Sequence, residues 1–182
     1  AAVDEILRRV GGWKNEFMDR RVRVDVAAFY MDWKNVQQFI RFQFIDPVTG
    51  LLRGVTGVDN ATSAESKGLE FSVEALVTDS IRIGAQAGYL DAKYGQYTNA
   101  LIDGQVINAS GKRLINAPEW TVGANAQFTR EVREGTDGFL RVEWLHRSEQ
   151  LSNTFALRYE VFPFISPAYN VVNLRAGIGN DR

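Results

Sequence analysis

Apolar and polar side chains alternate with a period of two through most of this 182-residue chain, in blocks separated by turn-forming residues. In the block RVRVDVAAFY, residues 21–30, the valines fall on one face, whereas arginine and aspartate fall on the other. Comparable blocks lie at residues 69–77, 81–89, 120–129, 140–144 and 172–178, with a weaker one near residues 9–17. Such alternation is typical of strands with one apolar and one polar face. The sequence therefore predicts an all-β chain of about seven strands.

The lengths of strands and connections distinguish a membrane barrel from a soluble β-sandwich. Most predicted strands run for about 10 residues, the length that a tilted strand needs to cross a bilayer, whereas soluble strands average about 5–6 residues. Tight turns are predicted at residues 18–20, 78–80 and 179–181, a short connection at 131–138, and long segments at 44–63, 95–118 and 151–168. Short and long connections thus alternate, as in outer-membrane barrels with short periplasmic turns and long extracellular loops. We therefore expect an antiparallel transmembrane β-barrel segment with meander topology.

The composition excludes several other classes of protein. No run approaches the roughly 18 apolar residues of a membrane-spanning helix, so a helical membrane protein is excluded. The formal net charge of -1, from 21 basic and 22 acidic residues, predicts no basic surface for nucleic acid. Cysteine is absent, which removes disulfides, thiolate metal sites and cysteine nucleophiles. Residues 1–5 contain no basic segment before an apolar core, so we expect no signal peptide within this sequence.

The polar face carries charge on nearly every predicted strand. A membrane barrel turns such residues towards a hydrated lumen, whereas a soluble barrel packs apolar side chains inside. The predicted lumen residues are Arg23, Asp25, Glu70, Glu74, Arg82, Arg141, Glu143 and Arg175. Aromatic residues near strand ends are expected to form two interfacial girdles, although strands are rich in aromatics in general. They are Phe17, Tyr30, Trp33, Tyr89, Tyr94, Trp120, Phe128 and Trp144.

No group of residues stands out as a catalytic or metal-binding site. The single histidine, His146, has no G-x-S-x-G nucleophile motif to act with and is expected to face lipid or the rim. Glu70 and Glu74 could serve acid–base chemistry, but pairing with lumen arginines accounts for them better. Residues 104–112 carry six residues between two glycines, whereas a phosphate-binding loop has four. We therefore expect no catalytic residue, no cofactor and no metal site, and the protein is not expected to be an enzyme.

Three segments resemble TonB-dependent outer-membrane receptors of the siderophore-uptake type. Residues 11–37, GGWKNEFMDRRVRVDVAAFYMDWKNVQ, are similar to a family strand, its tight turn and the following strand. Residues 60–94, NATSAESKGLEFSVEALVTDSIRIGAQAGYLDAKY, resemble the next hairpin, whose family pattern ends in G-Y-x-D-A-x-Y. Residues 111–128, GKRLINAPEWTVGANAQF, resemble the pattern L-P-N-A-P before a strand, with Ile115 in place of the usual proline. The three matches occur in order and extend the resemblance over about residues 11–179.

This resemblance implies a barrel of about 22 strands in a Gram-negative outer membrane, occluded by an N-terminal plug domain. Substrate would bind at the outer face, and the TonB complex would drive import through a short box on the plug. We find no plug, box, signal peptide or terminal aromatic strand in this sequence, so residues 1–182 are expected to form one partial β-barrel domain. About seven strands are fewer than the eight of the smallest membrane barrels. Both edges would then hold unpaired backbone groups, and the segment alone is not expected to be stable.

The leading functional hypothesis is a non-enzymatic receptor for energy-coupled uptake of a ferric siderophore or a similar scarce nutrient. The implied partners are this ligand, the TonB complex through the plug, and outer-membrane lipid, but not nucleic acid. Aromatic and cationic side chains in the long loops and upper lumen suit aryl or anionic chelates. The candidate substrate-binding residues are Tyr94, Tyr97, Arg113, Arg158 and Tyr159. Each could instead be a solvated loop residue or a girdle aromatic.

Two other hypotheses stay open at this point. A passive porin-type channel would need no plug. A soluble β-barrel or β-sandwich binding protein would need no detergent. In addition, residues 155–164, FALRYEVFPF, are aromatic enough to form the extended top of a strand rather than a free loop.

Overall fold

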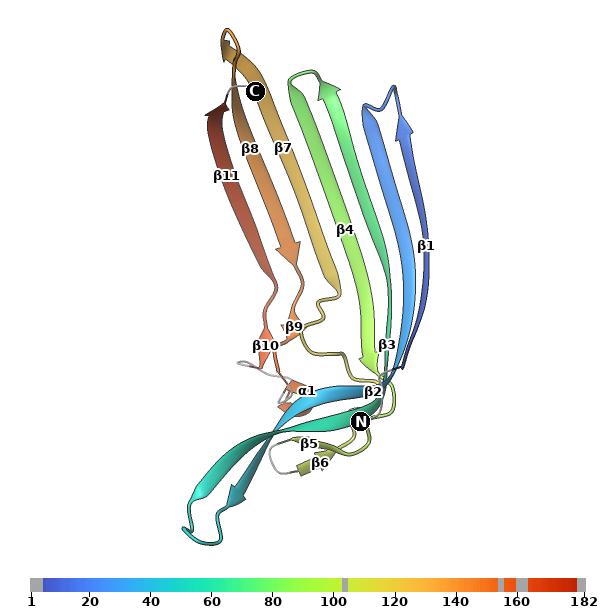
Figure 1. The fold of residues 1–182 in the computed structure, drawn as a ribbon, viewed down its shortest axis with the longest axis vertical. Coiled ribbons are helices and arrows are strands. Elements are labelled where there is room, and N and C mark those ends of the chain that lie inside the picture. The colour runs from blue at the N-terminus through green and yellow to red at the C-terminus, as the bar shows by residue number, and fades with distance from the viewer. Residues whose placement is uncertain (1–4, 103–104, 154–155, 160–163, 180–182) are drawn as a thin grey trace.

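The computed structural model describes residues 5–102, 105–153, 156–159 and 164–179. Its main feature is a seven-stranded antiparallel sheet in the order β1-β2-β3-β4-β7-β8-β11, so each long strand pairs with the next one along the chain (Figure 1). These strands are β1 (Glu5–Phe17), β2 (Val22–Ile45), β3 (Leu52–Thr78), β4 (Ile81–Tyr94), β7 (Trp120–Arg133), β8 (Thr136–Arg147) and β11 (Tyr169–Gly179). The predicted all-β meander is confirmed, with β1 and β11 at its two edges.

Short turns join the strands at one end of the sheet, and long connections lie at the other (Figure 1). The predicted tight turn after β1 is present, and its residues Met18, Asp19 and Arg20 all have positive φ angles, from 53° to 67°. The connection predicted at residues 131–138 is a turn between Arg133 and Thr136, because the strands continue to those residues. The turn predicted at residues 179–181 falls almost wholly outside the described residues. Short turns mark the periplasmic end of an outer-membrane barrel, so the other end is extracellular.

The expectation of a long loop at residues 44–63 was wrong. β2 and β3 stay paired from Val36↔Ala61 to Ile45↔Leu52, and this extension, the arm, projects beyond the sheet (Figure 1). Asn35, with a φ of 58°, lies at its base. At its tip the Asp46 carboxylate accepts hydrogen bonds from the backbone N–H of Val48 and Thr49 (2.9 and 3.2 Å). The bond from Val48 lowers the pKa of Asp46 most, and the bond from Thr49 lowers it further. Together they fix a tight turn where a loop was expected.

The cross-strand register confirms the predicted assignment of residues to two faces. On the inner face, Arg23 lies opposite Glu74, and Arg141 lies opposite Arg175. The outer face carries large apolar side chains that are exposed, including Phe71 at 43% exposure. In water, an apolar surface of this extent would be strongly unfavourable, whereas in a bilayer it meets lipid.

Six of the eight predicted girdle aromatics lie on the outer face by this register: Phe17, Tyr30, Tyr89, Trp120, Phe128 and Trp144. Tyr89 and Trp120 are cross-strand partners whose rings lie 4.9 Å apart. For Trp33 and Tyr94 the girdle assignment was wrong, because both flank Ala64 on the inner face. A girdle ring must face lipid, so these two have another role.

Shorter elements fold at the extracellular end. They are β5 (Ala100–Ile102), β6 (Gln105–Ile107), β9 (Gln150–Leu151), β10 (Ile165–Ser166) and the helical turn α1 (Ala156–Tyr159). The expectation of an extended strand top at residues 155–164 was wrong for residues 156–159, which are helical; residues 155 and 160–163 lie outside the described part of the chain. Within the described ranges, no helix has the length and apolar character to cross a membrane.

Candidate functional site

The extracellular connections have a hydrophobic core of their own. We call the described residues 95–118 and 148–168 the mouth lobe. Its buried side chains pack against the inner face of the extracellular strand ends: the core comprises Val36, Ala64, Tyr94, Tyr97, Ala100, Ile102, Ala109, Leu151, Ala156 and Leu157. A backbone hydrogen bond of 2.7 Å from Asn116 to Leu151 joins the two segments of the lobe. The loops at the mouth are therefore held in one packed arrangement rather than as separate loops.

Two of the predicted substrate-binding residues, Tyr94 and Tyr97, lie inside this core. Their exposed fractions are 1% and 0%, and their ring centroids are 5.2 Å apart. Burial raises the pKa of the Tyr94 hydroxyl well above its usual value, so this phenol stays neutral. Their position points to packing of the mouth lobe, and a direct contact with substrate stays a prediction.

Arg113, the third candidate, connects separate parts of the mouth lobe. Its guanidinium lies 3.6 Å from the Glu119 carboxylate and 3.7 Å from that of Glu149, and it donates a 3.1 Å hydrogen bond to the Glu149 carbonyl. Its backbone forms a bridge with Lys93 at the end of β4. These contacts tie the segment before β7 to the segment after β8.

Replacing Arg113 with alanine should loosen these two segments and leave the barrel wall intact. Partly exposed ion pairs contribute about 0.2–1 kcal/mol each, so the effect should be local. We expect hydrogen exchange of residues 111–119 and 148–151 in the folded protein to become several-fold faster. Arg113→Lys keeps the charge but loses the planar fork, so it should give an intermediate rate. Unchanged exchange in Arg113→Ala would show that the three contacts do not hold the lobe.

The last two candidates, Arg158 and Tyr159, form a patch at α1. The Arg158 guanidinium carbon lies 4.8 Å from the centroid of the Tyr159 ring, and one of its nitrogens donates a 3.5 Å hydrogen bond to the Ile102 carbonyl. Tyr159 stacks on Phe164 with centroids 5.7 Å apart and is 37% exposed. A cation over the exposed Tyr159 ring, which the partly buried Phe164 supports, suits an anionic or aryl ligand. The structure thus brings these two together, with Tyr159 exposed and Arg158 partly buried, in contrast to the fully buried Tyr94 and Tyr97.

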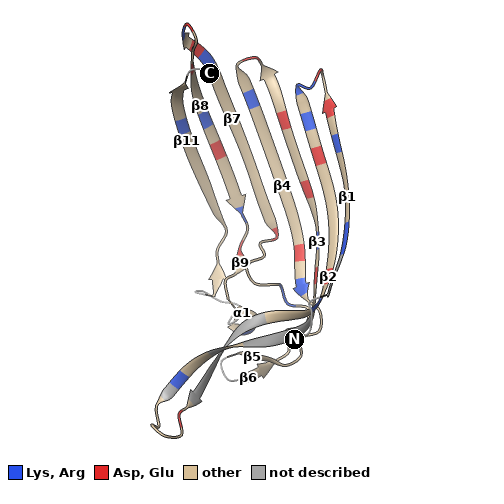
Figure 2. Ribbon diagram, in the orientation of Figure 1, with Lys and Arg blue, Asp and Glu red and all other residues tan. Residues whose placement is uncertain are grey.

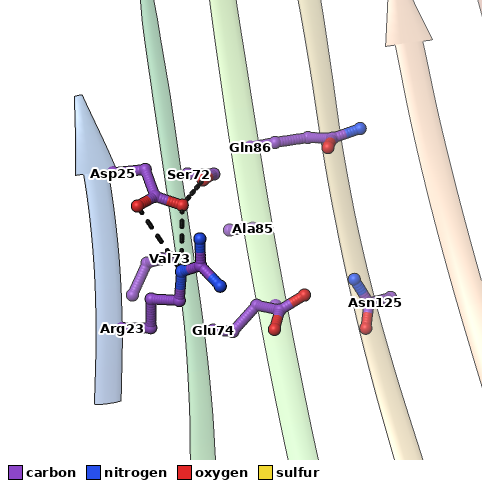
Figure 3. A pocket seen from close by; sticks show the side chains of 9 residues that line it. Arg23, Asp25, Ser72, Val73, Glu74, Ala85, Gln86 and Asn125 are labelled. Carbon is purple, nitrogen blue, oxygen red and sulfur yellow. Dashed lines mark hydrogen bonds and ion pairs between the residues drawn. The ribbon is translucent and has the colours of Figure 1, made fainter. Parts of the chain in front are cut away.

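The inner wall nearer the periplasm is polar and hollowed. A hollow of about 290 Å³ is lined by Arg23, Asp25, Glu74, Gln86 and Asn125 among others (Figure 3). There the Arg23 guanidinium lies 3.2 Å from the Asp25 carboxylate, which also accepts a 3.5 Å hydrogen bond from Ser72. Nearer the edge of the sheet, both Arg141 and Arg175 bind the Glu143 carboxylate, at 2.9 and 3.0 Å. Several lumen charges therefore pair with one another. For Glu70 and Glu74, pairing with lumen arginines stays a prediction.

A second charged group lies on the outer face and was missed from the sequence. Tyr30, Glu65, Lys67, Asp91 and Lys93 follow one another across β2, β3 and β4, and we call them the outer ladder. The acidic and basic residues at this end of β4 are visible in Figure 2. The signal was present in the sequence: Glu-x-Lys on one strand and Asp-x-Lys on the next share the parity of the apolar face.

The predicted position of His146 on the outer face is confirmed. Its ring stacks with that of Trp144 (6.2 Å), and both side chains hydrogen-bond to the side-chain oxygen Oδ1 of Asn170, His146 at 3.1 Å and Trp144 at 3.2 Å. Among the residues that the structure describes, no group of three or more histidine, aspartate or glutamate side chains is arranged to hold a metal ion.

Comparisons with known proteins agree with this geometry. Residues 10–181 match the family model described as TonB dependent receptor-like, beta-barrel. The fold is similar to the siderophore receptor PiuA from Acinetobacter baumannii, with 16% sequence identity and a TM-score of 0.62 over 95% of this chain and 22% of that one. It is also similar to the siderophore receptor PirA from the same organism, with 14% identity and a TM-score of 0.54 over 96% of this chain and 25% of that one. The chain thus spans a quarter or less of these receptors.

Proposed function

Because the chain belongs to the TonB-dependent receptor family and forms part of its outer-membrane β-barrel, we propose that it serves energy-coupled uptake of a ferric siderophore or a similar scarce nutrient. The observation that carries this proposal is the packed mouth lobe with Arg158 and Tyr159 at its surface. The two solved structures compared above are siderophore receptors, which supports the choice of ligand class. The soluble β-barrel or β-sandwich alternative does not fit this family.

In this proposal the candidate residues have different roles. Arg158 and Tyr159 contact the ligand, because a guanidinium and an exposed ring can bind anionic and aryl groups together. Tyr94 and Tyr97 give the lobe its core, and Arg113 ties its segments. Residues 1–182 form one part of the barrel domain, and their polar inner wall faces a plug through which the TonB complex acts. No step in this scheme makes or breaks a covalent bond, in keeping with a receptor rather than an enzyme.

The test is uptake by cells that express the full-length receptor. Iron-55-labelled ferric catecholate and ferric hydroxamate chelates serve as probes. Arg158→Gln with Tyr159→Ala should reduce uptake of a transported chelate at least tenfold, because a cation–π contact and a charge-assisted bond are both lost. Val48→Ala, at the fully accessible tip of the arm, is the matched control (Val48 is 91% exposed) and should leave uptake unchanged.

A proton ionophore separates this proposal from the passive channel. Uptake that stops when the ionophore is added supports energy coupling. Uptake that continues would favour the porin-type alternative, and equal uptake by the double variant and the wild type would remove Arg158 and Tyr159 from the binding site.

A further inference from the structure

A row of arginines crosses the inner wall near its periplasmic end. By register, Arg82 on β4 lies opposite Gln127 on β7. Gln127 in turn lies opposite Arg141 on β8, which lies opposite Arg175 on β11. We call these residues the arginine row, and it covers three strand spacings, about 14 Å. Arg82 is the second residue of β4 after the short turn, so the row lies close to the periplasmic rim. Basic bands near this end of β4, β8 and β11 are visible in Figure 2.

The arginines of this row outnumber the carboxylates that pair with them. Glu143 binds two of them, with one oxygen 2.9 Å from Arg141 and the other 3.0 Å from Arg175. Arg82 is exposed and forms no ion pair within the described part of the chain. Glu74 on the adjacent strand lies one row away, opposite Gly84. Three arginines thus share one carboxylate, and the row keeps a surplus of two positive charges.

The direct opposition of Arg141 and Arg175 is unfavourable by itself, because like charges that face each other across two strands destabilise a sheet. The shared Glu143 carboxylate offsets part of this repulsion, and Gln127 accepts a 3.3 Å hydrogen bond from Arg141. These contacts use two nitrogens of Arg141 and one of Arg175. A guanidinium has five N–H donors, so the donors that are left, with those of Arg82, can bind a further anion.

We propose that the arginine row binds the anionic groups of the transported chelate as it leaves the barrel for the periplasm. This inference rests on the proposed function and specifies its substrate class, namely chelates with a net negative charge. Arg158 at the mouth suits the same kind of group, so a cationic site lies at each end of this wall. Planar guanidinium forks match carboxylate oxygens. Because the row lies at the far end from the mouth, it acts on transport and not on the first binding of the chelate.

The test measures uptake by cells that express variants of the full-length receptor. Arg82→Gln with Arg175→Gln removes the surplus charge and leaves Arg141 paired with Glu143. The probes are iron-55-labelled ferric tricatecholate and ferric dicitrate, which are anionic, and a ferric trihydroxamate, which is neutral. This variant should lower the maximal uptake rate of the anionic chelates roughly tenfold, because charge-assisted bonds to the row are lost. Uptake of the neutral chelate should stay within about twofold of the wild type, since it offers no anionic group to the row.

The matched control is Arg8→Gln with Lys14→Gln. It also removes two exposed cations from the inner face, but from β1, at positions opposite Met31 and Asp25. Uptake of all probes by this control should stay close to that of the wild type. Binding of the chelates at the cell surface, measured with a proton ionophore present to stop transport, should have the same Kd in every variant. A change in uptake rate at constant Kd is the expected mark of a site at the exit.

The outcomes separate a transported anion from a carboxylate of the plug. Equal uptake of the anionic chelates by the wild type and the arginine variant would overturn the inference, as would uptake of the neutral chelate alone by the wild type. An equal loss for the neutral chelate, or faster hydrogen exchange of the plug in the purified variant, would assign the arginines to plug contacts and overturn it as well. If the wild type takes up none of the probes, the proposed function itself fails, and this inference fails with it.

Discussion

Replacing Gly68 with alanine is expected to destabilise the folded receptor strongly and to lower its folded fraction in the outer membrane. Gly68 is buried on the inner face of β3. A Cβ at this position would overlap the backbone carbonyl oxygen of Tyr89 and would lie 2.6 Å from the Phe29 ring. The ring can move, but the carbonyl belongs to the neighbouring strand and cannot give way without a break in the pairing of β3 with β4. Overpacking typically costs about 1–3 kcal/mol, and we expect the upper end here.

Gly88→Ala is the matched control for this prediction. Gly88 lies on the adjacent strand and on the same face, but the nearest atom to an added Cβ is the Thr121 carbonyl oxygen at 3.8 Å, an ordinary contact. The heat-modifiable folded fraction in outer membranes and the urea midpoint of the full-length receptor would measure both variants. If Gly68→Ala and Gly88→Ala behaved alike, the close approach of Gly68 to Tyr89 would not be a real constraint.

Replacing Phe71 with arginine should also strongly destabilise the receptor, through the bilayer rather than through packing. Phe71 lies on the outer face, 43% exposed, within the apolar surface. An arginine on the lipid face of a membrane barrel costs roughly 2–4 kcal/mol near the midplane and less towards the interfaces. Folding into vesicles of phosphatidylcholine, followed by urea titration, gives the change in free energy of unfolding.

The next residue along the strand provides the control. Ser72 points to the opposite face, where its hydroxyl donates to Asp25. Ser72→Arg places the same charge in a hydrated lumen beside carboxylates, and we expect a change within about 1 kcal/mol. A larger loss for Ser72→Arg than for Phe71→Arg would reverse the assignment of the two faces.

The sequence was sufficient to predict the strands of the seven-stranded sheet and their two faces, because the side chains of these strands alternate with a period of two. A strand that is apolar on one side and charged on the other leaves its faces readable, and a register slip of one residue would exchange them. Valines of residues 22–26 and the charges at Arg23 and Asp25 therefore predicted the two surfaces correctly. His146, whose parity matches that of Trp144, was placed on the correct face for the same reason.

The arm was missed because pairing and burial are different signals. Alternation predicts a strand where one face is buried away from water. The tip of the arm has no such buried face, since Ile45 and Leu51 are 68% and 64% exposed. The arm is held by its own cross-strand hydrogen bonds, by the turn at Asp46, and by an ion pair of 2.7 Å between Asp46 and Arg53. Asp46-Pro47 before Gly50 was a turn signal that a more local interpretation would have used.

The division of roles in the mouth lobe depends on tertiary contacts between distant segments. Nothing local distinguishes Tyr97, which is fully buried, from Tyr159, which is 37% exposed, since both are tyrosines in predicted long loops. Tyr97 is buried in one hydrophobic core with Ile102 and Leu157, and Leu157 is 60 residues further along the chain. No periodicity or local motif in a single sequence predicts such packing between distant segments.

The meander order of the long strands also determines how the number of strands in a β-barrel of this kind can change during evolution. Because each long strand pairs only with its neighbours in sequence, a hairpin joined by a short turn can be duplicated or deleted without rerouting any other strand. Each added hairpin would widen the wall by about 10 Å, twice the spacing between neighbouring strands. The connections after β2, β4 and β8, which join one such hairpin to the next, are then the natural junctions at which a barrel of this design could gain or lose circumference during evolution.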